Sequence, residues 1–155
     1  TISNAIENIK QWCSQIKDNS SFSVEMSTRS KKRKVRLYDF SLSAGKGNDI
    51  DNDVSYTEYA TDETDCDFAL KVSGDSMEPN IPNDSIVLIK QCDCVDAGEI
   101  GAFYYDGEVY CKRLLCENGK SYLESINTKY APIEIIPENT LKVYGKIIAV
   151  EQLQK

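Results

Sequence analysis

Two dipeptides, Asp106-Gly107 and Asn118-Gly119, constrain the fold of this chain more than any other feature. Each lies between runs that are rich in β-branched and aromatic residues, where Asp-Gly or Asn-Gly is the strongest short-range signal for a β-hairpin. The β-rich runs occupy residues 85–91, 99–127 and 140–153. The chain has neither the βαβ alternation of a parallel sheet nor a glycine-rich phosphate loop. We therefore expect a mainly β domain built as an antiparallel sheet.

The first part of the chain follows a different pattern. Residues 4–18 carry apolar side chains at helical spacing, which predicts one amphipathic helix. Residues 18–30 are polar and rich in serine, which is typical of a connector. We expect an N-terminal helix and arm over residues 1–37, followed by one compact domain over residues 38–155. Because the chain starts at a threonine, we also expect it to be a fragment of a longer polypeptide.

The charge of the chain limits its partners. A net charge of −7 argues against this part gripping DNA, because phosphate binding needs a basic surface. The charge is uneven: residues 31–36 read KKRKVR, whereas residues 49–68 hold many carboxylates and no basic residue. We interpret the basic run as a solvated face or linker, with phosphate contact as the alternative. No apolar run approaches the roughly 18 residues of a membrane span and no signal segment opens the chain, so we expect a cytoplasmic protein with no membrane partner.

The six cysteines do not form a recognisable metal or disulfide pattern. Without a secretion signal, reduced thiols are expected. Cys92-Asp93-Cys94 lacks the two-residue spacer that is usual in zinc sites made of cysteine alone. We expect buried or incidental thiols, no metal site and no cofactor. The cysteines are Cys13, Cys66, Cys92, Cys94, Cys111 and Cys116.

The stretch VSGDSMEPN, residues 72–80, places Ser76 on a turn of small residues in a chain that contains no histidine. Ser-His-Asp and Cys-His arrangements both need an imidazole as base, so neither can form here. The bases that remain are a carboxylate, an α-amino group and a lysine that loses its proton on burial. Lysine is the one whose pKa moves far when it is desolvated.

Lys112 lies in the strand-like run EVYCKRLLC, residues 108–116. In period-2 alternation it shares a face with Tyr110, Leu114 and Cys116, which would bury its aliphatic stem. From this run alone, the favoured interpretation is an ordinary lysine whose ammonium group reaches solvent from an edge strand. The spacing does not establish a catalytic pair.

Taken together, these motifs resemble a known family. Residues 73–79 (SGDSMEP) are followed by residues 110–114 (YCKRL), residues 123–127 (LESIN) and a closing run at 143–147 (VYGKI). This order is similar to that in the peptidase domain of LexA, UmuD and the phage CI-type repressors, and the resemblance runs from about residue 38 to residue 150. Signal peptidases have a similar serine motif, but they need a membrane anchor, and we expect none in this protein. The resemblance implies a LexA-like, signal-peptidase-like antiparallel β fold.

The resemblance also implies a Ser76-Lys112 dyad that cuts the protein's own chain at a small-residue bond upstream of the serine. The segment Ser43-Ala44-Gly45-Lys46-Gly47 offers the Ala44-Gly45 bond, and the alternative is that this segment is only a flexible loop. Neutral Lys112 would take the hydroxyl proton as Ser76 attacks the Ala44 carbonyl, and would return it to the leaving amine of Gly45.

Three further roles complete the expected site. The backbone N–H groups of Asp75 and Ser76 are expected to donate to the oxyanion, as the resemblance also implies. We assign Met77 to the wall of the cleft, because methionine is more often a packing residue than a catalytic one. Gly74 would relieve the turn that carries the serine.

The function implied is that of the C-terminal autoproteolytic and dimerisation domain of a phage-type or LexA-like repressor, of the kind used in SOS responses. Such a domain would form a homodimer, respond to a RecA filament or an antirepressor protein, and act with a DNA-binding domain outside this chain that holds the operator. Because only 44 residues precede the expected bond, a UmuD-like accessory protein is one alternative. A second alternative is a non-cleaving dimerisation module that docks an antirepressor. The joint presence of Ser76, Lys112 and an Ala-Gly bond favours the enzyme.

Overall fold

The computed structural model describes residues 31–40 and 54–153. The expected N-terminal helix and the Ala44-Gly45 bond lie outside the described residues. The chain from Lys32 onward forms one compact unit, and residues 33–37, which the sequence analysis assigned to the arm, belong to its sheet. The strands are β1 (Arg33–Tyr38), β2 (Tyr56–Thr61), β3 (Phe68–Lys71), β4 (Ser85–Gln91), β5 (Ile100–Tyr105), β6 (Glu108–Glu117), β7 (Lys120–Glu124), β8 (Ile133–Ile135) and β9 (Leu141–Gln152).

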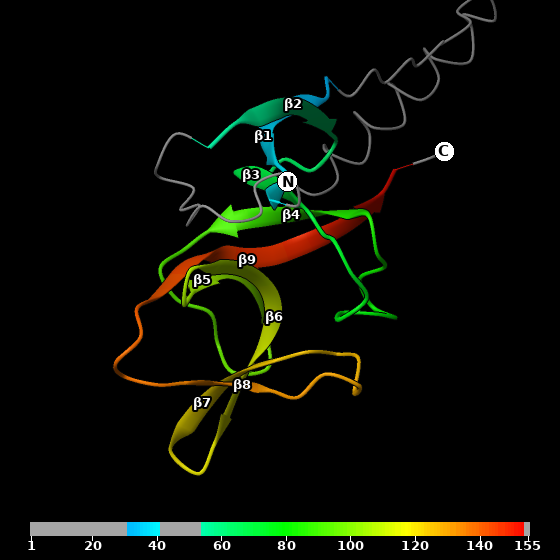
Figure 1. Ribbon diagram of the computed structural model, residues 1–155. Coiled ribbons are helices and arrows are strands. Elements are labelled where there is room, and N and C mark those ends of the chain that lie inside the picture. Colours follow the sequence, from blue (N-terminus) through cyan, green and yellow to red (C-terminus); the bar gives the residue numbers. More distant parts are fainter. Residues whose placement is uncertain (1–30, 41–53, 154–155) are drawn as a thin grey trace, which may run out of the picture. The chain divides into compact units, whose positions relative to one another are not determined.

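These nine strands form one sheet in the order β2-β1-β3-β4-β9-β5-β6-β7-β8 (Figure 1). The mainly β class is confirmed, and every neighbouring pair is antiparallel except β1 with β3. The exception follows from chain order. β2 pairs with one edge of β1 and runs against it, and the chain then reverses to place β3 on the other edge of β1, in the direction of β1.

Both predicted hairpin turns are confirmed. Asp106 and Gly107 join β5 to β6 with φ values of 48° and 84°, and Asn118 and Gly119 join β6 to β7 with φ values of 52° and 76°. Two successive positive φ values are those of a type I′ turn, whose twist matches the right-handed twist of the paired strands. The turns therefore position β6, the strand that carries Lys112.

The long strand β9 bends the sheet at its centre. It pairs with β4 on one side and β5 on the other, and each ladder contains a register shift that is typical of a β-bulge. Tyr59 and Thr61 of β2 both donate hydrogen bonds to the Glu151 carboxylate of β9, although three strands separate β2 from β9 in the sheet. The first five strands of the sheet order therefore curl until the β2 edge meets β9.

The core lies on both faces of β4. Residues Ser85 to Ile89 are all buried, and their side chains alternate between two hydrophobic clusters. Val87 and Ile89 pack with Met77 and Leu70, whereas Ile86 and Leu88 pack with a second cluster that contains Ala69. The turn before β4 is therefore anchored to the core directly beneath it.

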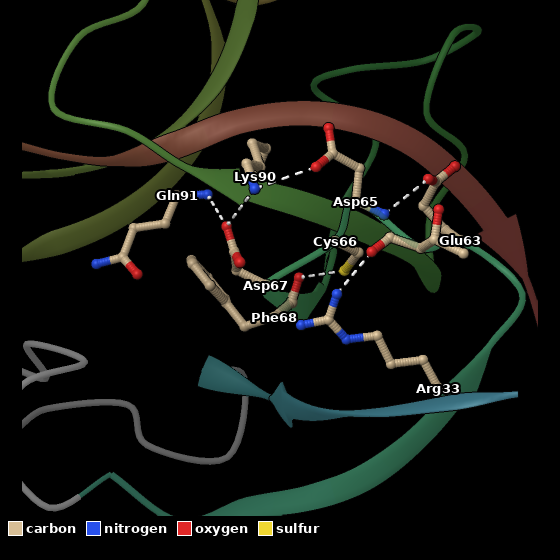
Figure 2. Close-up of polar contacts among 9 residues, drawn as sticks. Arg33, Glu63, Asp65, Cys66, Asp67, Phe68, Lys90 and Gln91 are labelled. Atoms are coloured by element: carbon tan, nitrogen blue, oxygen red, sulfur yellow. Dashed lines mark hydrogen bonds and ion pairs between the residues drawn. The ribbon is translucent and has the colours of Figure 1, made fainter.

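Ion pairs and a hydrogen bond connect the acidic loop between β2 and β3 to β4. Figure 2 shows Asp65 and Asp67 facing Lys90, with N–O distances of 3.1 and 3.6 Å. Asp67 also accepts a hydrogen bond of 2.7 Å from the Gln91 backbone N–H, and Arg33 donates to the Thr64 carbonyl at 2.6 Å. The loop thus brings two carboxylates to a lysine at the surface, where ion pairs contribute little to stability.

The basic run forms an exposed strand rather than a linker. Lys34 lies 2.9 Å from the Glu58 carboxylate of β2, and the Arg36 guanidinium lies 4.6 Å from the centre of the Tyr56 ring. These cationic side chains contact the acidic and aromatic strand beside them. Both charges of the Lys34 pair are more than two-thirds exposed, so solvent screens the pair.

Candidate active site

Ser76 lies in the turn that joins β3 to β4. Gly74 opens this turn with a φ of 96°, a conformation that favours glycine, and its N–H donates to the Asn83 side-chain oxygen at 2.7 Å. Met77 and Ile81 are each about 1% exposed and belong to the core cluster below. The serine is therefore carried on a backbone that is fixed by packing on one side of it and by the Gly74 hydrogen bond on the other.

Lys112 reaches the serine from β6. Its Nζ donates a hydrogen bond to the Ser76 Oγ at 2.6 Å, and the lysine residue is only 7% exposed. The neighbours of Lys112 in β6 alternate as predicted. Val109 and Cys111 pack against the core cluster beneath the turn, whereas Tyr110 packs against a second hydrophobic cluster. The structure therefore contradicts the solvent-reaching lysine that the strand pattern alone favoured, because the turn carrying Ser76 lies over this part of β6.

The surroundings of Lys112 favour its neutral form. Burial lowers the pKa of the Lys112 ammonium group, and an interaction with Cys111 opposes this only in part. Burial also raises the pKa of the Cys111 thiol to about 12, so this cysteine stays protonated at neutral pH and is not an activated nucleophile. The Ser76 hydroxyl accepts the hydrogen bond of the Lys112 ammonium group, and the Tyr110 ring lies 6.0 Å from the same Nζ.

A segment that follows β7 forms hydrogen bonds to the turn that carries Ser76. The Asn127 backbone N–H donates to the Ser76 carbonyl at 2.9 Å, and the Asn127 side-chain amide donates to the Asp75 carbonyl at 3.1 Å. The Tyr130 hydroxyl donates to the Asp75 carboxylate at 2.5 Å, and this bond lowers the pKa of Asp75. Asn127 belongs to the motif Ser125-Ile126-Asn127, which the sequence pattern alone left without a role. No local signal could have assigned a role to Asn127 or Tyr130, because their partners lie about 50 residues earlier.

A cleft of about 490 Å³ opens along the side chains of Ser76 and Lys112. Ser76 and Lys112 line it together with apolar side chains from β3 and β6 and with Tyr130 and Ala131 from the segment after β7. Met77 and Asp75, which the sequence analysis assigned to the cleft wall and the oxyanion site, also line it. The expected scissile residues, Ala44 and Gly45, lie outside the described residues.

The arrangement contains the two groups that a serine nucleophile and an amine base need. A serine hydroxyl at hydrogen-bonding distance from a buried amine can lose its proton to that amine once the amine is neutral. The family comparison points the same way, since a family model described as Peptidase S24-like matches residues 36–148. The chain belongs to this peptidase S24-like family.

Curated relatives of this peptidase S24-like chain carry the name LexA repressor. The protein from Magnetococcus marinus is 34% identical over 84 residues, which cover 54% of this chain and 36% of the relative. The protein from Carboxydothermus hydrogenoformans is 37% identical over 87 residues, which cover 54% of this chain and 41% of the relative. LexA repressor 2 from Pseudomonas putida is 38% identical over 81 residues. The matched region spans about two-fifths of the length of these curated relatives.

Two kinds of feature are absent from residues 31–40 and 54–153. This part of the chain contains no group of three or more histidine, cysteine or acidic side chains that could hold a metal ion. It also contains no helix that is long and apolar enough to cross a bilayer. The five cysteines within it, from Cys66 to Cys116, are free thiols.

Proposed function

We propose that this S24-like domain cuts its own chain at Ala44-Gly45, with Ser76 as nucleophile and Lys112 as base, and thereby switches off a LexA-like repressor. One observation carries the proposal: the Lys112 Nζ lies 2.6 Å from the Ser76 Oγ at a site where the lysine is 7% exposed. Burial supplies what a neutral lysine base requires, because it lowers the pKa of Lys112.

The reaction has two stages, acylation of Ser76 and hydrolysis of the resulting ester. Neutral Lys112 accepts the hydroxyl proton while Ser76 Oγ forms a bond to the Ala44 carbonyl carbon. The tetrahedral intermediate collapses, the C–N bond breaks, and the Lys112 ammonium returns the proton to the amine of Gly45. Lys112 then takes a proton from water as the water oxygen bonds to the Ala44 carbonyl carbon, the bond from that carbon to Ser76 Oγ breaks, and the Lys112 ammonium returns the proton to Ser76 Oγ. The backbone N–H groups of Asp75 and Ser76 donate to the developing oxyanion.

A tethered substrate makes this reaction a switch. The bond to be cut is part of the same chain, so its effective concentration is high and the cleavage rate depends on the fraction of molecules in which the 43–47 segment is docked in the cleft. A RecA filament or an antirepressor protein would act on that step as inducer. Cleavage would separate the homodimeric peptidase domain from an operator-binding domain outside this chain, in keeping with the repressor names of the relatives.

Incubation of the purified protein at rising pH tests the proposal. We expect two products, residues 1–44 and 45–155, at a rate that rises with pH because deprotonation of Lys112 creates the base. Ser76→Ala and Lys112→Ala should stay intact, and Lys112→Arg should stay intact because a guanidinium does not deprotonate in this range. Ser121→Ala, a serine on β7 outside the cleft, should cut like the wild type. Intact mass spectrometry reads the products.

Two outcomes would contradict this function. Cleavage in Ser76→Ala, or at another bond, would remove the assignment of the residues. A wild-type protein that stays intact up to pH 10 while folded would instead favour a non-cleaving dimerisation module.

A further inference from the structure

Asn127 holds the backbone on both sides of the nucleophile. Its backbone N–H donates to the Ser76 carbonyl at 2.9 Å, and its side-chain amide donates to the Asp75 carbonyl at 3.1 Å. The Asp75 carbonyl belongs to the peptide unit before the Ser76 Cα, and the Ser76 carbonyl belongs to the peptide unit after it. One residue, 51 positions away in the chain, therefore contacts the carbonyl groups of both peptide units that flank the serine.

The orientation of the Asn127 amide group is itself set. Its side-chain oxygen accepts a hydrogen bond of 3.1 Å from the Lys129 backbone N–H, which leaves the NH₂ group directed at Asp75. The Asp75 carbonyl also accepts a bond of 3.1 Å from the Glu78 backbone N–H. Two donors thus fix the plane of the peptide that joins Asp75 to Ser76.

Fixing that plane also fixes a donor. A peptide unit is planar and trans, so its C=O and N–H point in opposite directions. When the Asp75 carbonyl points towards Asn127 and Glu78, the Ser76 N–H of the same plane must point away from them. Ser76 lines the cleft, and its N–H is one of the two donors that the proposed mechanism places at the oxyanion.

We propose that Asn127 is a positioning residue for the oxyanion site: it holds the Asp75–Ser76 peptide plane so that the Ser76 N–H faces the developing negative charge. The inference rests on the proposed self-cleavage. Donors that are already oriented stabilise a transition state without reorganisation, and this preorganisation is lost when the plane can rotate. Asn127 does not touch the reacting atoms and acts only through this backbone.

Asn127 and Lys112 should affect the pH–rate profile in different ways. A residue that positions the oxyanion donor sets the maximal rate, whereas the environment of Lys112 sets the pH at which the rate reaches half of that maximum. Asn127→Ala should therefore lower the plateau of the pH–rate profile about ten- to a hundredfold, less than the roughly hundred- to thousandfold loss when an oxyanion donor is removed outright. The midpoint of the profile should stay where it is in the wild type.

The test compares full pH–rate profiles of cleavage in the 155-residue chain, read by intact mass spectrometry. Asn127→Asp is a second variant of nearly the same shape, which keeps the acceptor for the Lys129 N–H but cannot donate to the Asp75 carbonyl when ionised, and its plateau should fall as well. Asn139→Ala is the matched control, because it removes a side-chain amide that donates to the Tyr105 hydroxyl, away from the cleft. Its profile should match the wild type.

The possible results distinguish failure of the role proposed for Asn127 from failure of the proposed self-cleavage. A wild-type plateau in Asn127→Ala, with normal Ser76-dependent cleavage in the parent, would overturn this inference alone. A fall that comes with a shifted midpoint would also overturn it, because Asn127 would then act through Lys112. A parent chain without Ser76-dependent cleavage would remove the proposed function, and this inference with it. A lowered plateau at an unchanged midpoint, in a variant whose thermal unfolding stays cooperative, supports it.

Discussion

At the scale of the residue, Lys112 has a stability consequence that is independent of cleavage. Its pKa in the fold is lowered from 10.5 by burial, so the unfolded chain holds the proton more tightly than the folded one. Protonated Lys112 therefore destabilises the folded state. This destabilisation is complete at pH values below the folded-state pKa. It falls as the pH rises between the folded-state and unfolded-state pKa values, and it is absent above the unfolded-state pKa. Lys112→Met should therefore raise the free energy of unfolding at neutral pH, and the gain should shrink as the pH approaches 10.5.

Urea unfolding at several pH values measures this effect. Lys120→Met is the contrasting control, because a hydrogen bond to Glu134 raises the pKa of the exposed Lys120, which makes a small stabilising contribution below the unfolded-state pKa. Loss of that contribution should lower stability slightly at neutral pH, the opposite sign to Lys112→Met. A gain from Lys112→Met that stays constant up to pH 11 would show that the lysine carries no ionisation cost in the fold.

At the scale of the element, β9 depends on one glycine where it lies between β4 and β5. A Cβ on Gly145 would lie 2.3 Å from the Lys90 carbonyl oxygen and 2.6 Å from the Ile89 Cγ2, so the β4 backbone would have to move. We expect Gly145→Ala to lower the free energy of unfolding by about 3 kcal/mol, at the upper end of the usual cost of overpacking.

The matched comparison is Gly107→Ala in the β5–β6 turn. Nothing lies within 4 Å of a Cβ there, and only the φ of 84° opposes a side chain. Its cost should be about 1–2 kcal/mol, the usual penalty for a left-handed residue. Equal losses for the two variants in urea unfolding would mean that β4 and β9 do not approach as closely as the structure has them.

At the scale of the whole molecule, the proposed homodimer has a candidate surface at the end of β9. Val150 and Leu153 are 39% and 53% exposed, and exposed apolar side chains at the end of a strand are candidates for an interface. We expect sedimentation to show a dimer, because paired operator half-sites call for a repressor with two-fold symmetry. Leu153→Asp should raise the dimer dissociation constant at least about tenfold, the effect of an interface residue worth more than about 1 kcal/mol.

The control is Ile136→Asp, which places the same charge on another apolar side chain that is 39% exposed, just after β8. It should leave the dissociation constant unchanged. A wild-type chain that remains a monomer at high micromolar concentration would count against the dimer, and an equal effect of both substitutions would count against this surface.

The sequence by itself determined the features that depend on neighbouring residues. Asp106-Gly107 specifies its turn because asparagine, aspartate and glycine tolerate positive φ, and the apolar run 85–91 predicted β4 with the bounds that the structure has. The order of the serine and lysine motifs indicated the family, which the match over residues 36–148 shows. β1, β2, β3 and β8 were not predicted as strands. Residues of β1, β2 and β8 are largely exposed and alternate weakly, and β3 has only four residues.

Only the tertiary structure decided which distant groups meet. The pattern of β6 favoured a lysine that reaches solvent, and Lys112 is buried because the turn before β4 lies over it. Asn127 carries no local sign of its role, since both carbonyls that it contacts belong to Asp75 and Ser76. The physical reason is that turn geometry and strand period are set by steric preferences within a few residues, whereas desolvation and hydrogen-bond partners depend on which segments the curled sheet brings together.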